Sequence, residues 1–507
     1  MTHHQPAQKT LQPLNLLSRV DFGNEAGDDI DPEEIKHFFV AQETFAWFLD
    51  PRYKIMLATA KKGVGKSALI RWIEYTLAAD PTENALIIRC KGNDLVRSNF
   101  NLSTPLRSPN EYIRDWMVRI CTLVNRKLAQ RISLAVGDDQ MSLVENAEID
   151  GYRKKHILSA LIDRLSTKSS KLPEHSRPRV TNEIELLKRI AEKRVWILID
   201  DLDATYQRSN EENLELSTFF SACRYLTTEI KGLFFRVTMR TDVWPIIRRY
   251  DESLDKMEQY VSDITWSQKD FRSLLYRRIK YQLDLLHVPI TKPPAHVTED
   301  EIQEHYIDLI FAKRMAWGDF ERRTYKIIYT MSYHRPRWAI QLCKLAQAEA
   351  LRAGATTIER EHIDEIWGKY GKRRIEDLIV EHKHQCAQIE ELLNGFRGAE
   401  RRMNRNELLK WIENHISNHI TPVIDGAEAK SPMQIAHFLF RIGFIVARAQ
   451  AASEDYEHYY FSDMPDFLSG RTNQDFNSVW EIHPCYREAL DIAKLNRYQK
   501  KNRNLAR

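Results

Sequence analysis

The chain has 507 residues, of which 43% are hydrophobic and 29% are charged, and its formal net charge is +4. This length predicts about two to four domains. The balanced charge excludes a polycationic protein, and the lack of a long apolar run predicts that no helix spans a membrane. The N-terminus has no secretory signal pattern, and the six cysteines form no CxxC pair, so we expect reduced thiols and a cytoplasmic location.

The first half of the chain is predicted to form an α/β core with a parallel sheet and helices on both faces. Residues 1–31 are polar and predicted to be flexible, and the core is expected over 32–265 with a helical insertion at about 110–190. Long crossovers between the strands favour parallel pairing. The predicted strands are residues 53–60, 85–90, 195–200, 233–239 and 260–265.

A glycine-containing loop directly follows the first predicted strand and precedes a predicted helix. It comprises Lys62, Gly63, Val64, Gly65, Lys66, Ser67 and Ala68. Glycines let backbone N–H groups surround phosphate oxygens, Lys66 carries a charge to the β- and γ-phosphates, and the Ser67 hydroxyl is a ligand for Mg²⁺. Ala60 occupies the position of the usual first glycine, so we interpret a variant phosphate-binding loop. The alternative is a glycine-rich turn without a ligand.

A second hydrophobic strand ends in carboxylates, as a nucleotide site requires. Asp200 lies at the end of strand 195–200 and is the candidate Mg²⁺ ligand, while Asp201 is the candidate that polarises an attacking water. Adjacent carboxylates after a buried strand are costly to bury unless a cation is near. For Asp203 a direct catalytic role and a role in holding the loop or capping a helix both stay open.

Two arginines are candidate sensors of the γ-phosphate. Arg240 follows the predicted strand 233–239, and the alternative for it is a salt bridge at the strand end. Arg337 begins a predicted helix beside Pro336 and is placed to reach the nucleotide from a helical lid over 266–380, with Arg335 as the reserve candidate.

The region 385–490 has the pattern of a winged-helix-like domain. Predicted helices at 405–412 and 431–443 precede strands at 444–448, 457–461 and 479–484. Such a domain binds DNA or docks onto protein, and its second helix offers His437 and Arg441 as phosphate or base contacts. Basic residues also gather in the insertion between 140 and 179 and in a tail over 491–507, where a polyanion or an acidic partner would fit.

Taken together, these motifs resemble the AAA+/STAND side of the P-loop ATPases. The order of loop, Asp-Asp strand, Thr-Met-Arg strand and Arg-Pro-Arg helix is similar to a bacterial FunZ-like ATPase family, with likeness to origin-recognition ATPases, over about 21–374. The resemblance implies ATP and Mg²⁺ as cofactors. It makes Lys66 and Ser67 the Walker A pair and Asp200 and Asp201 the Walker B pair. It also makes Arg240 the STAND-type sensor and Arg337 the sensor in the lid.

The resemblance implies a slow ATPase that acts as a molecular switch. Such a protein forms homo-oligomers and regulates a separately encoded protein effector in bacterial antiphage defence. An alternative is an initiator- or loader-like ATPase that binds DNA or RNA, and a third possibility is a nucleotide-binding scaffold that does not hydrolyse ATP. Asp201 in place of the commoner Glu, together with Ala60, keeps the third possibility open.

Overall fold

The computed structural model describes residues 15–25, 27–81, 85–100, 108–131, 194–288, 296–318, 320–449, 457–470, 475 and 477–492. Backbone contacts divide the chain into two compact units. We call Ala26–Thr265 the core unit and Met1–Glu25 together with Trp266–Arg507 the composite unit. Within the described ranges, no helix combines the length and the apolarity that crossing a bilayer requires.

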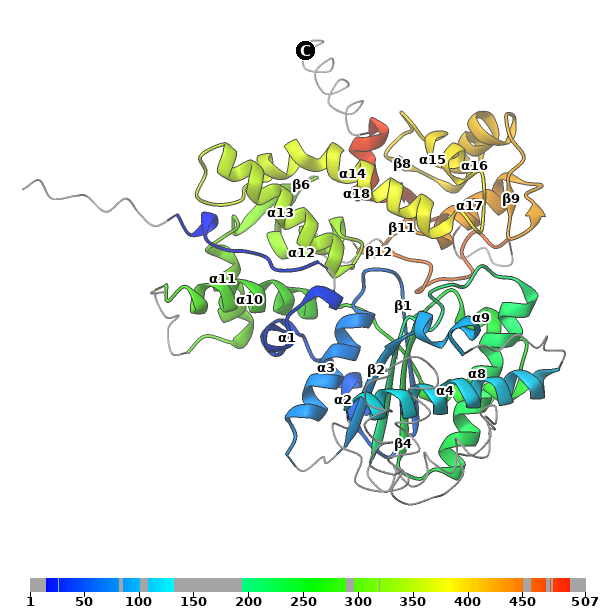
Figure 1. Ribbon diagram of the computed structural model, residues 1–507. Helices are drawn as coiled ribbons and strands as arrows, with labels where there is room; N and C mark the ends of the chain where they lie inside the picture. Colours follow the sequence, from blue (N-terminus) through cyan, green and yellow to red (C-terminus); the bar gives the residue numbers. More distant parts are fainter. Residues whose placement is uncertain are drawn as a thin grey trace, which may run out of the picture. The chain divides into compact units, whose positions relative to one another are not determined.

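The core unit is built on a five-stranded sheet in which every strand runs parallel to its neighbours (Figure 1). The strand order is β2-β3-β4-β1-β5, so that β1 lies between β4 and β5. The predicted fold class, a parallel sheet with helices on both faces followed by a helical region, is confirmed. The strands are β1 (Ile55–Ala60), β2 (Leu86–Lys91), β3 (Val195–Asp200), β4 (Leu233–Arg240) and β5 (Val261–Asp263).

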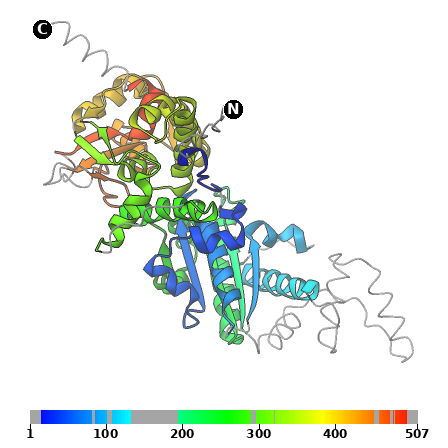
Figure 2. The ribbon, with the colours of Figure 1, turned by 90° about the vertical axis from the view of Figure 1, so that its left-hand side faces the viewer.

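The two faces of this sheet are covered by different helices. Alternate residues of a strand point to opposite faces, and one alternate set, including Ile197 and Val237, packs with residues of α4 (Pro109–Arg131) and α8 (Asn210–Glu229) in one apolar cluster. Helix α3 (Lys66–Ala79) contacts β1, β2, β3 and β4 but contributes no residue to that cluster, and Figure 2 shows it in front of the sheet. The sheet is therefore buried on both sides, as its apolar strands require.

Short elements complete the core unit. They are η2 (Gly27–Asp29), α1 (Pro32–Phe38), η3 (Glu43–Phe45), α2 (Ala46–Leu49), η4 (Gly92–Leu95), η5 (Arg97–Phe100), α9 (Trp244–Ile247) and η6 (Glu252–Tyr260). Helix α4 covers the start of the predicted insertion. The rest of the insertion, including its basic residues, lies outside the described residues.

The composite unit contains a helical part that begins just after the core unit. Its elements are α10 (Gln268–Leu285), α11 (Glu299–Asp308), β6 (Arg314–Trp317), β7 (Phe320–Arg323), α12 (Thr324–Met331), α13 (Pro336–Arg352) and α14 (Arg360–His382). Strands β6 and β7 pair as an antiparallel hairpin.

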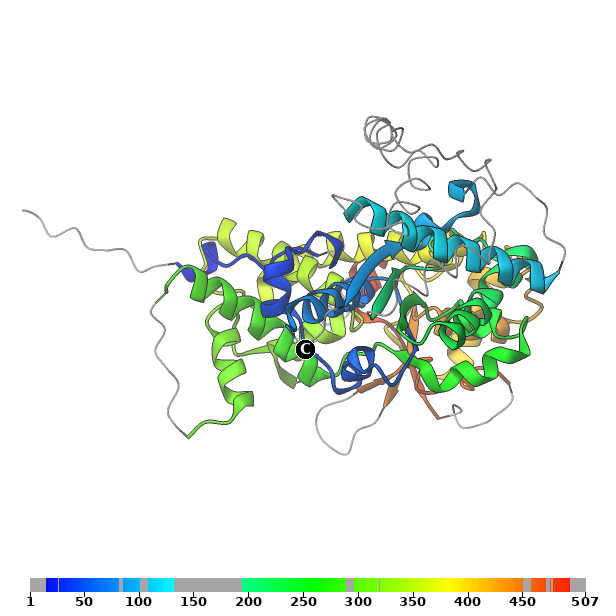
Figure 3. The ribbon, with the colours of Figure 1, turned by 60° about the horizontal axis from the view of Figure 1, so that its bottom comes forward.

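Residues 15–25 pack onto these helices, which differs for this stretch from the flexibility predicted for 1–31, while residues 1–14 lie outside the described residues. Leu17 and Phe22 are fully buried beside η1 (Leu16–Ser18). Gln347 of α13 donates to the carbonyl oxygens of Leu17 and Val20 at 2.7 and 2.6 Å, and Arg278 of α10 donates to that of Phe22. Figure 3 shows this dark-blue segment beside the green helices. Contacts with distant residues order it, and local composition does not reveal such contacts.

The last part of the composite unit pairs short helices with a four-stranded antiparallel sheet in the order β12-β11-β13-β8. The predicted helix, helix and hairpin are present as α16, α17, β11 and β12. The elements are α15 (Ile389–Asn394), β8 (Arg402–Met403), α16 (Arg405–Ile412), the π-helix η7 (Glu413–Ser417), β9 (Val423–Ile424), β10 (Ala427–Glu428), α17 (Pro432–Arg441), β11 (Ile445–Ala449), β12 (Glu457–Tyr459), β13 (Val479–Ile482), α18 (Pro484–Arg487) and η8 (Glu488–Leu490).

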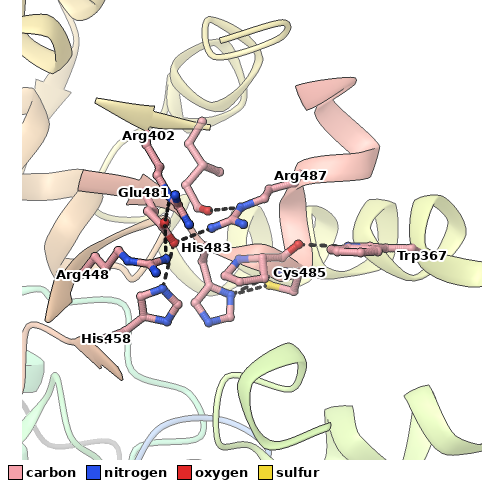
Figure 4. Close-up of polar contacts among 10 residues, drawn as sticks. Trp367, Arg402, Arg448, His458, Glu481, His483, Cys485 and Arg487 are labelled. Atoms are coloured by element: carbon pink, nitrogen blue, oxygen red, sulfur yellow. Dashed lines mark hydrogen bonds and ion pairs between the residues drawn. The ribbon is translucent and has the colours of Figure 1, made fainter. Parts of the chain in front are cut away.

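A buried carboxylate holds this sheet together (Figure 4). Glu481 of β13 has no exposed surface and is bound by four side chains: Arg402 at 2.7 Å, Arg448 at 3.1 Å, His458 at 3.0 Å and Arg487 at 2.8 Å. Burial acts to raise the pKa of Glu481, but the Arg487 guanidinium and the hydrogen bonds from His458 and Arg402 outweigh it and hold the pKa well below its usual range. These contacts join β13 to the other three strands of the sheet and to α18.

Candidate functional site

The phosphate-binding loop has the backbone that its glycines predict. Between β1 and α3, Gly63 has φ +79° and Gly65 has φ +120°, values that residues with a Cβ rarely adopt. Ala60 is the last residue of β1 and has no positive φ, so the missing glycine is no obstacle there. The loop can therefore form with this sequence.

The first turn of α3 is kept free of the usual protein caps. Its N-cap residue, Gly65, provides no side chain, and the first turn contains no acidic residue. Helices α8 and α10, by contrast, have complete capping boxes, from Ser209 with Glu212 and from Ser267 with Asp270. The uncapped N–H groups and the positive end of the helix dipole make the start of α3 suited to an anion.

Lys66 and Asp201 form an ion pair beside this loop. The distance from Nζ of Lys66 to Oδ1 of Asp201 is 3.3 Å. Lys66 is 8% exposed, whereas the Asp201 side chain is 47% exposed. The pair brings the predicted phosphate-binding lysine and the predicted water-polarising carboxylate together across the ends of β1 and β3.

Thr238 of β4 connects the Asp200 carboxylate to the backbone of Asp201 and was missed by sequence reasoning. Its Oγ1 donates to Oδ1 of Asp200 at 2.8 Å and accepts from the backbone N–H of Asp201 at 2.9 Å. The carbonyl oxygen of Thr238 accepts from the N–H of Leu202 at 3.0 Å. Both Thr238 and Asp200 are buried, and Asp201 has φ +47°. One hydroxyl thus fixes the orientation of Asp200 and the left-handed turn at Asp201.

Asp203 and Arg240 form the next pair along the same edge. Nε of Arg240 lies 2.9 Å from Oδ2 of Asp203, and the backbone N–H of Arg240 also donates to the Asp203 carboxylate. Burial raises the pKa of Asp203, while the charges of Arg240 and Lys66 act in the opposite direction. In this structure Asp203 holds the loop, and Arg240 makes the strand-end salt bridge that was its alternative assignment.

Two glycines let backbone segments approach the site closely. A Cβ on Gly92, directly after β2, would lie 2.3 Å from the carbonyl oxygen of Asp201. A Cβ on Gly27 would lie 2.6 Å from the backbone nitrogen of Ala68, in the first turn of α3. Sequence reasoning missed both residues. The position of Gly92 at the carboxyl end of a predicted strand was a usable signal, whereas Gly27 offered none.

The candidate lid arginines lie in the composite unit and differ in their surroundings. Arg335 is 2% exposed and donates to Oε2 of Glu381 at 2.6 Å, with its guanidinium 4.3 Å from the ring centre of Trp338. The Arg335 side chain therefore has a structural role through Glu381 and Trp338, and it makes no capping hydrogen bond to the start of α13, although Arg335 is its N-cap residue. Arg337 lies half-buried in the first turn of α13, and its role as a lid sensor stays a prediction.

The predicted nucleic-acid contacts of α17 are engaged inside their own domain. Nδ1 of His437 donates to the carbonyl oxygen of Phe467 at 3.1 Å, and Arg441 pairs with Asp425 at 2.6 Å. The basic tail beyond Ile492 lies outside the described residues. The six cysteines are all buried and free of disulfides, in agreement with reduced thiols.

Fold and site together define a parallel α/β core with a glycine loop at the start of α3, followed by a helical region. A sequence profile described as the FunZ-associated C-terminal helical domain matches residues 294–379. No curated protein matched the chain.

The chain is also similar to solved structures at low sequence identity. Cdc6p from Pyrobaculum aerophilum is 12% identical over 93% of this chain and 99% of its own, with a TM-score of 0.34. The Aeropyrum pernix ORC2 protein in ADPNP and ADP complexes is 11% identical over 90% and 93%, with a TM-score of 0.41. Domain III of the Thermotoga maritima replication initiation protein DnaA is 10% identical over 67% and 98%, with a TM-score of 0.30.

Proposed function

We propose that the chain binds and hydrolyses ATP with Mg²⁺. The observation that carries this proposal is the meeting of Lys66, Asp201 and Asp200 at the carboxyl edge of the parallel sheet, next to a glycine loop that opens α3. In the proposal, Lys62 to Ala68 bind the phosphates and Asp201 orients the attacking water. Arg240 and Arg337 respond to the γ-phosphate.

The residues at the site also fit a magnesium ion. Hydroxyl and carboxylate oxygens are the ligands that Mg²⁺ prefers, and Ser67 and Asp200 provide one of each. Bound with ATP, Mg²⁺ supplies charge neutralisation to the β- and γ-phosphates. Thr238 contributes by holding the Asp200 carboxylate in one orientation.

The ion pair between Lys66 and Asp201 makes the site responsive to its ligand. Both the phosphates and Asp201 are anions that compete for the single Lys66 ammonium group. Phosphate binding therefore frees the Asp201 carboxylate, which is already half exposed, to act on water. Phosphate binding and the release of Asp201 for hydrolysis are thus linked through Lys66.

We further propose that this cycle drives a molecular switch. The chain would form homo-oligomers in the ATP state and regulate a separately encoded protein effector, in bacterial antiphage defence, and hydrolysis would reset it. The match of residues 294–379 to the FunZ-associated helical domain supports this proposal. The proposal includes the assignment of the chain to the AAA+ and STAND ATPases and the role of Arg337 as a nucleotide sensor.

A DNA-binding initiator or loader is the second candidate. The helix, helix and hairpin order of α16, α17, β11 and β12 supports it. The engagement of His437 and Arg441 within their own domain weighs against reading of DNA by α17. DNA binding through phosphates predicts a steep fall of affinity with salt, whereas assembly with a protein effector does not.

The test combines nucleotide binding, phosphate release and mass measurement on the full chain. Purified protein is run on a mass-measuring size-exclusion column with and without Mg·ATP, beside Lys66→Ala and Asp201→Asn. We expect ATP-dependent assembly that Lys66→Ala abolishes, and phosphate release that both variants lose.

Two outcomes would contradict the proposal in different ways. Absence of nucleotide binding by the wild type would exclude the ATPase. Nucleotide binding without assembly or phosphate release would exclude the switch and leave a static nucleotide-binding scaffold.

A further inference from the structure

A turn with an unfavourable backbone joins α12 to α13. Two successive residues, Tyr333 and His334, have φ +52° and φ +58°. Residues with a Cβ are disfavoured in this left-handed region, and two in succession are rarer still. The turn is closed by the N–H of Arg335 donating to the carbonyl of Ser332 at 3.0 Å. Such a conformation persists only where surrounding contacts hold it.

The contacts that hold the turn come from the antiparallel sheet of the same unit. The buried ring of Tyr333 lies 5.0 Å from the ring of Tyr460 and 4.8 Å from that of His483, between ring centres. These residues follow β12 and β13. The ring of His334 stacks on Tyr329 at 3.8 Å and meets Tyr460 edge-on at 4.5 Å. Aromatic packing therefore ties the turn to the end of the sheet.

Gly443 makes the approach of Tyr333 possible. This residue, between α17 and β11, has φ +82°, and a Cβ there would lie 2.0 Å from the hydroxyl oxygen of Tyr333 and 2.4 Å from Cζ. A methyl group and the Tyr333 ring cannot both occupy this space. The tyrosine is thus seated in a gap that only glycine leaves open.

Both sides of this contact are rigid. On the sheet side, the Glu481 cluster locks β8, β11, β12 and α18 around β13, two residues before His483 (Figure 4). On the helix side, the turn is followed at once by Arg335, buried and paired with Glu381, and then by the first turn of α13, which carries Arg337. If the first turn of α13 changes direction, neither the Glu481 cluster nor the Arg335–Glu381 pair can deform to absorb the change. The turn between them therefore transmits it to the sheet.

We propose that the Ser332–Arg335 turn is a latch that couples Arg337 to the C-terminal antiparallel sheet. This inference rests on the proposed function, in which Arg337 responds to nucleotide. When the start of α13 moves with nucleotide, Tyr333 moves relative to Gly443 and His483, and the unfavourable backbone makes release of the turn easy once those contacts are lost. The C-terminal domain thereby receives the nucleotide signal, and by thermodynamic reciprocity its partners alter nucleotide affinity.

Gly443→Ala tests the latch, with Gly426→Ala as a matched control. Gly426 lies in the same domain at φ +83°, and a Cβ there would meet no atom within 4 Å. Both substitutions introduce a Cβ at the same unfavourable φ, but only Gly443→Ala collides with Tyr333. The full chain is titrated with a fluorescent ATP analogue, and hydrogen–deuterium exchange is measured with and without Mg·ATP.

In the wild type and in Gly426→Ala, we expect Mg·ATP to change exchange in β11 and β13. Gly443→Ala should lose that change and alter the dissociation constant of the analogue by about fivefold or more. If Gly443→Ala fails to fold, Tyr333→Leu is measured against the same criteria, since it removes the ring and keeps an apolar side chain.

The latch is excluded if the wild type binds the analogue while exchange in β11 and β13 stays unchanged. It is equally excluded if Gly443→Ala behaves as Gly426→Ala does. A wild type that binds no more analogue than Lys66→Ala overturns the latch together with the proposed ATPase, and this result is distinct from the first two.

Discussion

Lys66 and Asp201 form an ion pair in which the cation is buried and the anion faces solvent. When phosphate replaces Asp201 as the partner of Lys66, the free-energy cost of releasing Asp201 is small, because water can solvate the released carboxylate. The same geometry makes Asp201 a competitor of the phosphates for the lysine.

Asp201→Asn should bind ATP several-fold more tightly than the wild type and hydrolyse it about 100-fold more slowly, since loss of a general base costs roughly this much or more. Removing the negative charge removes the competitor for Lys66 and the group that polarises water. Fluorescent nucleotide titration and phosphate release measure the two effects, with Lys66→Ala as the variant that should not bind. Unchanged hydrolysis would rule out this role for Asp201.

Thr238→Val should impair catalysis while keeping the shape of the side chain. Valine leaves Oδ1 of Asp200 and the N–H of Asp201 without their hydroxyl partner, so we expect a loss of about 1–3 kcal/mol in the free energy of unfolding and a higher Mg²⁺ requirement. Thr238→Ser keeps the hydroxyl and should retain both properties. Magnesium titration of phosphate release and thermal melting provide the readouts. Equal behaviour of Thr238→Ser and Thr238→Val would refute the role of the Thr238 hydroxyl.

Gly92→Ala should disturb the site through steric pressure alone. The new Cβ would lie 2.3 Å from the carbonyl oxygen of Asp201 and 2.8 Å from that of Leu202, both backbone atoms. Overpacking of this kind costs about 1–3 kcal/mol and shifts the Asp201 turn, so hydrolysis should fall as well. Gly368→Ala in α14 is the control, because its Cβ would meet Glu488 at an ordinary 3.5 Å. If Gly92→Ala left both stability and hydrolysis unchanged, the loop would have to relax freely around the new Cβ, which would contradict this prediction.

Acid should destabilise the antiparallel sheet of the composite unit. The pKa of Glu481 is held low in the folded chain, and burial lowers the pKa of His458, so the unfolded chain binds more protons than the folded one at both positions. Stability from His458 is present above about pH 6.5 and decreases as the pH falls below it, and stability from Glu481 decreases below about pH 4.5. Thermal melting from pH 8 to pH 4 measures this dependence.

Glu481→Gln is the variant that checks the assignment. It should lose roughly 3–5 kcal/mol at neutral pH, because the buried Arg487, the half-buried Arg448 and the more exposed Arg402 lose their anion, and its melting temperature should depend less on pH below 4.5. Parallel pH profiles for wild type and variant would exclude Glu481 as the acid-sensitive group.

Elements with strong local signals were predicted well. Strand β3 and helix α16 occupy the predicted residues, because an uninterrupted apolar run and an amphipathic pattern are both visible in a short window. The glycine loop was recognised for the same reason. Its positive φ values at Gly63 and Gly65 are those that the motif requires.

Features that depend on distant residues were not predicted. Thr238 binds the Asp200 carboxylate 38 positions earlier and the backbone N–H of Asp201 37 positions earlier, and nothing near it in sequence indicates these contacts. Arg335 was a reserve candidate for the nucleotide until the structure paired it with Glu381, 46 positions later. The sequence likewise offered no sign that Tyr333 would pack against Gly443. Register between strands and packing between domains determine these contacts, and neither has a local pattern.

The packing of the first described residues onto α10 and α13 has a consequence for biosynthesis. Arg278 binds the carbonyl of Phe22 across 256 positions, and Gln347 binds that of Leu17 across 330. At roughly 5–20 residues per second, the ribosome needs about 13–51 s after making Phe22 before Arg278 exists. The continuous core unit is complete by then, so it can fold first. The segment with the apolar Leu17 and Phe22 is synthesised before the core unit but is buried after it, and chaperones have that interval to bind it.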